Sequence, residues 1–219
     1  MVAMTFSSTP AAPEIWANID RRLRTGDEDR WLSSRYAGES SRRSLVALYG
    51  FCWELARVRL IVTEPTMGAI RFQWWRDALE ELREGKQPRA HDVATAIAHM
   101  LADTVVSADD LLQIVDGYEA AYESKDRSLE PETRVALLAA RILDPATDFQ
   151  AGIETLAPVF AARRRCADID EQTATKRAAS VIRPAVAHFR LRRLYRRDTP
   201  PSALAKRLCV LRAVMSGWL

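Results

Sequence analysis

Apolar side chains recur every three or four positions along most of the chain, and this spacing places them on one face of an α-helix. The pattern is clearest over residues 49–82, where two such apolar stripes meet. The first stripe consists of Leu45, Leu48, Cys52, Leu55, Val58 and Val62. The second stripe consists of Met67, Ile70, Trp74, Ala78 and Leu82. Together they predict two long amphipathic helices, the unit from which a larger helical bundle is built.

Pro65 separates the two predicted helices. Proline suits the first turn of a helix, because the N–H that it lacks has no partner there, and it disfavours helix in the residue before it. One helix is therefore expected over residues 39–64 and a second over residues 65–84. Gly85 follows the second helix and is placed to end it.

Similar signals predict helices along the rest of the chain. Ser107 and Asp110 have the spacing of a capping box, which predicts a helix that runs to about Glu123. Pro158 and Pro184 are expected to interrupt the helices that contain them. The further predicted helices span residues 13–23, 30–35, 91–101, 131–143, 149–166, 173–197 and 200–217.

The composition agrees with an all-helical fold. The 219 residues include 8 glycines, whereas a β-rich fold normally needs more turn residues. Strand-like alternation of useful length is also missing from the sequence. We therefore expect an all-α, single-domain helical bundle over residues 13–219, preceded by a disordered N-terminus over residues 1–12.

Several features of the sequence predict a cytoplasmic protein. The first residues have neither the basic start nor the long apolar core of a signal peptide. A run of about 18 apolar residues, which a membrane-crossing helix would need, does not occur. The cysteines Cys52, Cys166 and Cys209 lie far apart in apolar helical contexts. This arrangement indicates buried thiols in a reducing compartment rather than a disulfide framework or a zinc site.

The last third of the chain is strongly basic, although the whole chain has a net charge of only +3. From Lys176 onward, the basic residues are Lys176, Arg177, Arg183, Arg190, Arg192, Arg193, Arg196, Arg197, Lys206, Arg207 and Arg212, and the one acidic side chain is Asp198. Two interpretations stay open: a solvated surface, or a site for an anionic membrane surface, a diphosphate or an acidic protein partner. Peripheral attachment at the inner face of the membrane is consistent with the second. Nucleic acid is not expected, because no recognisable nucleic-acid motif accompanies the charge.

Many common catalytic motifs are missing. The sequence contains no GxGxxG, no GxxxxGK[ST], no GxSxG and no HExxH. Asp77, Glu81 and Glu84 share one helical face, and carboxylates in that arrangement could hold Mg²⁺ with a diphosphate. The more common case is a solvated face, with Arg76 and Arg83 interleaved.

Several short motifs together resemble the squalene/phytoene synthase family, the head-to-head trans-prenyl transferases. They are YGFC at residues 49–52, EP at 64–65, RFQWWRDAL at 71–79 and LLQIVDGY at 111–118. The resemblance is good over residues 29–143 and weaker beyond. It implies an isoprenoid-synthase-like bundle around a central cavity. In the family, Asp-rich motifs on facing helices bind Mg²⁺, which holds and ionises an allylic diphosphate.

The acidic positions of the family motifs are altered in this sequence. The first Asp motif implies acids at about Ala56, Arg57 and Leu60, and the later helix implies one at Ala121. The basic residues 163–165 stand near the second Asp motif. These substitutions resemble one branch of the family, which includes a phytoene-synthase-like assembly factor of respiratory complex I. The shared pattern is ELA-x-V at residues 54–58, Glu64, Gly68 and RFQWW at residues 71–75.

The leading hypothesis is a non-catalytic member of this family, a pseudoenzyme for which no cofactor and no metal site is expected. It would bind an isoprenoid or lipid ligand, or a partner protein, and would aid assembly of a respiratory complex. The residues predicted to line its cavity are Tyr49, Cys52, Gln73, Trp74 and Tyr118. Trp74 and Trp75 either contribute to this cavity or pack in the core.

Two alternatives remain. One is a working head-to-head prenyl transferase of the phytoene/squalene synthase type, which would use Mg²⁺ to condense farnesyl or geranylgeranyl diphosphate. Its candidate catalytic residues are Glu54, Asp77, Glu81 and Asp116. The other is a structural protein whose cavity is filled by its own side chains.

Overall fold

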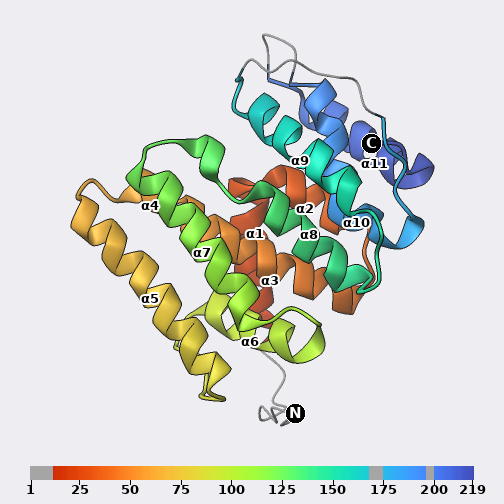
Figure 1. Ribbon diagram of the computed structural model, residues 1–219. Coiled ribbons are helices and arrows are strands. Elements are labelled where there is room, and N and C mark those ends of the chain that lie inside the picture. The colour runs from red at the N-terminus through yellow and green to blue at the C-terminus, as the bar shows by residue number, and fades with distance from the viewer. Residues whose placement is uncertain (1–11, 168–174, 196–199) are drawn as a thin grey trace. The chain divides into compact units, whose positions relative to one another are not determined.

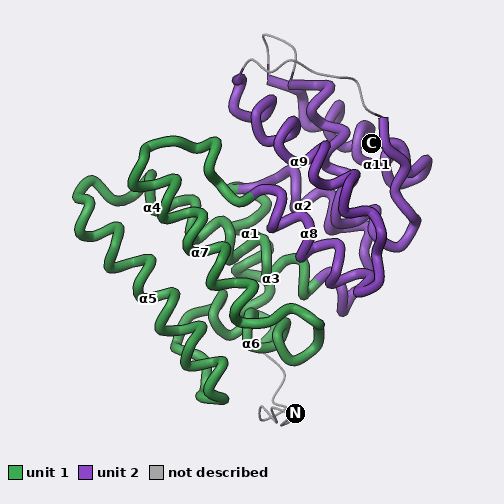
Figure 2. Tube along the Cα trace, in the orientation of Figure 1, with its two compact units in different colours: residues 1–26, 43–131 green, residues 27–42, 132–219 purple. Residues whose placement is uncertain are grey.

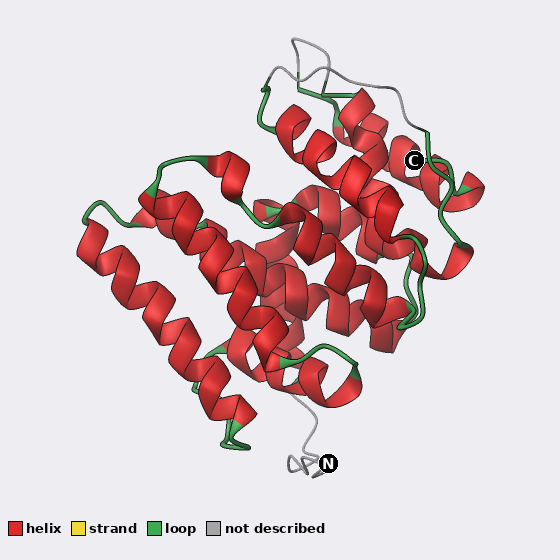
Figure 3. Cartoon of the chain, viewed as in Figure 1, coloured by secondary structure: helices red, strands yellow, loops and turns green. Residues whose placement is uncertain are grey.

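The computed structural model describes residues 12–167, 175–195 and 200–219 (Figure 1). The regular structure of these residues is helical, which confirms the predicted all-α fold class (Figure 3). The α-helices are α1 (Pro13–Gly26), α2 (Glu28–Ser34), α3 (Glu39–Ala56), α4 (Val58–Ile61), α5 (Pro65–Arg83), α6 (Asp92–Asp103), α7 (Ala108–Glu123), α8 (Glu132–Leu143), α9 (Gln150–Arg164), α10 (Arg183–Val186) and α11 (Ala203–Ser216). Short 3₁₀ helices are η1 (Arg127–Leu129), η2 (Ser180–Ile182) and η3 (Ala187–Arg193). The disorder predicted for residues 1–12 lies, apart from Ala12, outside the described residues.

The chain divides into two compact units (Figure 2). The first unit contains residues 1–26 and 43–131, and the second contains residues 27–42 and 132–219. Among the described residues, no helix combines the length and the apolarity needed to cross a bilayer.

The predicted helical hairpin is present in the first unit, with one added break. Pro65 occupies the first turn of α5, as expected, and Gly85 ends that helix in the left-handed conformation with φ +78°. The first helix does not continue to residue 64, because α3 ends at Ala56 and the short helix α4 follows. Ser107 and Asp110 form the predicted capping box at the start of α7.

The buried face of α5 differs from the predicted stripe. Met67 and Ile70 are 45% and 55% exposed, so their assignment to the core was wrong. The residues that α5 buries are Gly68, Phe72, Trp75, Ala78, Leu79 and Leu82. This set has the same three-and-four spacing, but it begins at a glycine, which a hydrophobicity pattern does not count. Trp75 takes the core position and packs edge-on against Phe51 of α3, with ring centroids 5.1 Å apart.

A glycine allows α5 to lie close to α7, and these two helices pack side by side (Figure 1). A Cβ atom added to Gly68 would lie 2.4 Å from the ring of Tyr122 on α7. The same ring lies 5.6 Å from the ring of Phe72, between centroids. Because Gly68 has no side chain, α5 and α7 lie close enough for Phe72 and Tyr122 to pack against each other.

In the second unit, the predictions for the two prolines have different outcomes. Pro158 lies inside α9, which continues through it; the side chain is exposed, so water can reach the carbonyl that loses its N–H partner. Pro184 lies in the first turn of the short helix α10, so the helix is interrupted there as predicted, but residues 180–193 form 3₁₀ and α turns rather than the long predicted helix. The parts of that prediction at residues 173–174 and 196–197 lie outside the described residues.

The last helix begins and ends with clear capping signals. Ser202 caps α11 by accepting a hydrogen bond from the backbone N–H of Ala205, at 3.2 Å. Gly217 ends α11 with φ +75°, the left-handed conformation that favours glycine. Cys52 is buried and Cys209 is half-buried, but Cys166 is exposed, so the expectation of a buried thiol was wrong there.

Gly68→Ala tests the close approach of α5 and α7. The added methyl group would overlap the Tyr122 ring, and overpacking of this kind typically costs about 1–3 kcal/mol, of which alanine recovers up to about 1 kcal/mol through its higher helix propensity. We therefore expect a net loss of about 1–2 kcal/mol in the free energy of unfolding, measured by chemical denaturation. Gly38→Ala is the control, because no atom lies within 4 Å of its added Cβ. Equal stability of Gly68→Ala and Gly38→Ala would contradict the close packing of α5 against α7 at Gly68.

Candidate functional site

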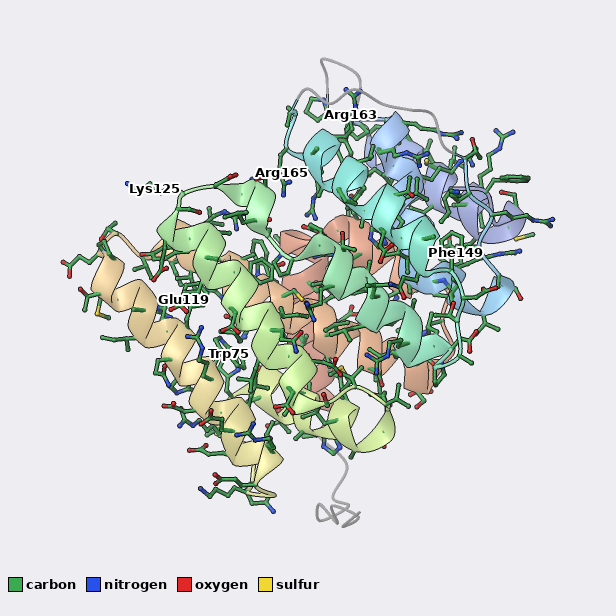
Figure 4. The ribbon with its side chains drawn as sticks, in the orientation of Figure 1. Trp75, Glu119, Lys125, Phe149, Arg163 and Arg165 are labelled. Atoms are coloured by element: carbon green, nitrogen blue, oxygen red, sulfur yellow. The ribbon has the colours of Figure 1, made fainter. Side chains whose placement is uncertain are left out.

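A pocket of about 900 Å³ opens in the first unit, between the α4–α5 linker and the C-terminal end of α7. We call it the α5–α7 pocket. Its lining residues are Arg59, Val62, Thr63, Pro65, Thr66, Ala69, Glu119, Ala121, Tyr122, Glu123, Lys125 and Arg127. The volume lies near the upper end of the range of small-molecule sites. Figure 4 shows Glu119 on α7 and Lys125 at the turn that follows this helix.

A smaller hollow of about 20 Å³ adjoins this pocket and shares Arg59, Ala121, Tyr122 and Arg127 with it. Its other lining residues are Leu55, Ala56, Tyr118 and Glu130. Ala56 from α3 and Ala121 from α7 thus lie on one hollow. These are two of the positions at which the family resemblance implies metal-binding acids.

Glu130 supplies the carboxylate of the small hollow, and arginines compensate its charge. The side chain is 6% exposed and lies 3.3 Å from Nη1 of Arg59 and 2.9 Å from Nε of Arg127. Arg59 also donates a hydrogen bond to the carbonyl of Ala56. Mg²⁺ prefers an octahedral set of oxygen ligands, usually with one or two carboxylates. A hollow with two alanines and a single carboxylate already paired to two guanidinium groups does not fit Mg²⁺.

Arg76 of α5 forms ion pairs with two acidic residues of α7, Asp116 and Glu119. Its guanidinium group donates hydrogen bonds to Glu119 and, at 2.7 Å, to Asp116. The hydrogen bond to Glu119, followed by that to Asp116, outweighs partial burial and raises the pKa of Arg76. Asp116, a candidate catalytic residue, is therefore an exposed partner of Arg76 and is not among the residues that line the α5–α7 pocket.

The other three candidate carboxylates are also paired with arginine. Glu54 lies 3.2 Å from Nη1 of Arg57. Glu81 accepts hydrogen bonds from Nε and Nη2 of Arg89, at 2.8 and 2.9 Å, and these bonds lower the pKa of Glu81. Asp77 lies 3.7 Å from the same guanidinium group. In the part of the chain that the structure describes, no group of three or more His, Cys, Asp or Glu side chains could hold a metal ion.

The five residues predicted to line a cavity have different environments. Tyr118 lines the small hollow. Tyr49 and Cys52 are buried in α3, at 1% and 0% exposure. Gln73 is exposed and donates a hydrogen bond to Asp77 at 2.7 Å, while Trp74 is half-buried under the guanidinium group of Arg89, 5.2 Å from the ring centroid. The structure thus places Tyr118 on a pocket, and the ligand-binding roles of all five stay predictions.

The second unit contains a buried cluster of charged residues that the sequence analysis did not identify. Arg164 of α9 lies 3.0 Å from Asp27 and 3.5 Å from Asp29. Asp29 also accepts a hydrogen bond from the Tyr195 hydroxyl at 2.7 Å and pairs with Lys206 of α11 at 3.0 Å. This cluster ties α2, α9 and α11 together. No local sequence signal marks the two aspartates of the run DED at residues 27–29 as buried.

Burial and charge shift two pKa values in this cluster. Burial alone would raise the pKa of Asp27, but Arg164 and Arg30 outweigh it and hold the pKa at about 2. Burial lowers the pKa of His188 to about 3, and the positive charges of Arg30 and Arg164 act in the same direction. The His188 ring packs 5.0 Å from the Phe160 ring, between centroids, and its Nδ1 atom is buried without a hydrogen-bond partner. The neutral imidazole is therefore the form that fits this site.

Comparison with known proteins identifies relatives of this chain. A family model described as squalene/phytoene synthase matches residues 23–138. NADH dehydrogenase (ubiquinone) complex I, assembly factor 6, of Rattus norvegicus is 32% identical over 123 residues, which cover 54% of this chain and 35% of the rat protein. The protein of the same name from Homo sapiens is 31% identical over 103 residues, covering 47% of this chain and 31% of the human protein. The match spans about a third of each relative. No solved structure matches the chain significantly.

The buried His188 predicts acid sensitivity. Below its usual pKa of 6.5, the unfolded chain binds a proton that the folded chain does not bind until about pH 3. The free energy of unfolding should therefore fall as the pH drops from 6.5 toward 3, by up to about 1.4 kcal/mol per pH unit from this residue. Asp27 adds to the loss between its usual pKa of 3.8 and about 2, because its folded pKa is depressed.

The measurement is urea denaturation across this pH range for the wild type and for His188→Phe. The phenyl ring fits the aromatic contacts of the site and binds no proton. We expect the variant to be folded at neutral pH and to lose less stability between pH 6.5 and pH 4. The same pH dependence in both proteins would contradict the role given to His188.

Proposed function

The chain belongs to the squalene/phytoene synthase family, and we propose that it is a non-catalytic member that helps to assemble a respiratory NADH dehydrogenase. In this proposal the α5–α7 pocket binds an isoprenoid or lipid ligand, or a segment of a partner protein. No metal ion takes part. The observation that carries the proposal is the small hollow with Ala56, Ala121 and an arginine-paired Glu130.

The chemistry of the family explains why this hollow matters. Ionisation of an allylic diphosphate develops negative charge on the leaving group, which metal ions and basic side chains must stabilise. Mg²⁺ in such sites is usually held by one or two carboxylates together with water and phosphate oxygens. The alanines supply no ligand from their side chains, and Glu130 lies against Arg59 and Arg127. The hollow therefore supports binding rather than metal-assisted ionisation.

The lining of the larger pocket supports an amphipathic ligand. Val62, Pro65 and Ala69 give apolar surface beside the ring of Tyr122. Basic groups are also present, among them Lys125, whose backbone has the uncommon φ of +56°. A molecule with an apolar chain and an anionic head group would match both features.

The names of the relatives support the assembly role. The rat and human proteins that match this chain are named as assembly factors of complex I. We extend this role to the present chain as a proposal, and the partner would be a subunit or an intermediate of that complex.

Deletion of the gene tests the assembly role. We expect less fully assembled NADH dehydrogenase on native gels, with normal amounts of the subunit transcripts. Glu54→Gln and Asp116→Asn should restore assembly as well as the wild type, because the proposed function uses no catalytic carboxylate. Unchanged assembly in the deletion strain, or failure of these two variants to rescue although they fold, would contradict the proposal.

A pair of adjacent substitutions tests the pocket. Ala69 lines the α5–α7 pocket, whereas its neighbour Ile70 does not line it and is 55% exposed. We expect farnesol or geranylgeranyl diphosphate to raise the melting temperature of the wild type and of Ile70→Trp. Ala69→Trp, whose indole would project into the pocket, should show a smaller increase. Equal increases for both variants would place the ligand elsewhere, and no increase for the wild type would exclude these ligands.

A further inference from the structure

One face of α11 exposes a continuous apolar stripe. Its residues are Leu204, Leu208, Leu211 and Met215, followed by Trp218 just beyond the helix, with exposed fractions of 65%, 57%, 41%, 74% and 46%. The spacing of four and three residues places the four helical members on the same side. The opposite side of α11 buries Val210 and Ala213. The exposed stripe is thus a second apolar face on a helix whose first apolar face is already packed.

Basic residues lie on both edges of this stripe. At 3.6 residues per turn, Arg207 and Arg212 project about 70° to either side of its centre, and both side chains are exposed. The helix contains no acidic residue. An apolar stripe with an exposed arginine on each edge suits a helix that lies in a membrane interface, with its apolar side chains among the acyl chains and its cations at the phosphates.

Further arginines surround the C-terminal end of the stripe. Arg183 donates hydrogen bonds to the carbonyls of Val214 and Met215, at 2.9 and 3.2 Å. The guanidinium group of Arg177 lies 6.0 Å from the ring centroid of Trp218. A tryptophan with its apolar ring beside cationic groups suits the boundary between head groups and acyl chains.

We propose that the stripe of α11 binds the surface of an anionic phospholipid bilayer, with the helix axis in the membrane plane. Charge complementarity favours this occupant, because Arg207 and Arg212 on the two edges and Arg177 beside Trp218 match a layer of phosphates above acyl chains, and the helix has no acidic residue to oppose them. The binding is peripheral and involves the second unit alone. It is independent of the α5–α7 pocket and of the assembly role.

Co-flotation of the purified full-length chain with lipid vesicles tests this proposal. The vesicles contain phosphatidylcholine alone or phosphatidylcholine mixed with phosphatidylglycerol. We expect binding to the anionic vesicles, little binding to the neutral ones, and a decrease as salt concentration rises. Absence of binding to anionic vesicles would overturn the proposal, and so would equal binding to both kinds.

Variants of the stripe separate this site from other exposed apolar residues. Leu208→Asp should weaken binding to anionic vesicles by at least about tenfold, because it places a charge among the acyl chains. The double change Arg207→Gln with Arg212→Gln should weaken it by roughly tenfold to thirtyfold and reduce its salt dependence. Leu60→Asp is the matched control, since Leu60 is 64% exposed on α4 of the first unit, and it should bind like the wild type.

The outcomes are distinct from those of the assembly experiment. The substituted side chains are exposed, so circular dichroism should show native helix content in every variant. Vesicle binding that survives Leu208→Asp would overturn the assignment to α11. Capture of a partner protein through the stripe, without vesicle binding, would also overturn it.

Discussion

The pairing of carboxylates with arginine guanidinium groups determines what the first unit can do. Arg59 and Arg127 converge on the buried Glu130, and Arg76 bridges Asp116 and Glu119. Glu130 is the buried member of these pairs, so loss of its arginines would leave a buried negative charge without compensation. These arginines therefore stabilise the walls of the α5–α7 pocket, and they also occupy the oxygen atoms that a metal ion would need.

The same ion pairs support the proposal that this chain keeps the fold of the family without its metal-dependent chemistry. The first unit retains the helical hairpin and a pocket between α5 and α7, which are the parts that a long apolar ligand or a peptide segment requires. The small hollow beside this pocket is lined by Ala56 and Ala121, two positions at which the family resemblance implies acids. The proposed binding function requires no other arrangement of these helices, and the names of the relatives support the proposed assembly role.

Local signals in the sequence predicted the helices well, because proline, glycine and capping residues act over a single turn. The capping box at Ser107 and the helix start at Pro65 are examples. The buried face of α5 was misassigned, because it begins at Gly68. A hydrophobicity pattern does not count glycine, but Gly68 is buried because Tyr122 packs directly against it. The ion pairs join residues far apart in the chain, such as Asp29 and Lys206, so no local pattern shows them. Ala56 and Ala121 drew attention only because the family resemblance implies acids at these two positions.

The central claim is that this chain uses the synthase fold without metal-dependent diphosphate chemistry. The most direct measurement is the release of diphosphate from farnesyl and geranylgeranyl diphosphate by the purified protein, over a range of Mg²⁺ and Mn²⁺ concentrations. We expect no release above the rate in buffer with either metal. Metal-dependent release that Glu54→Gln or Asp116→Asn abolishes would contradict it.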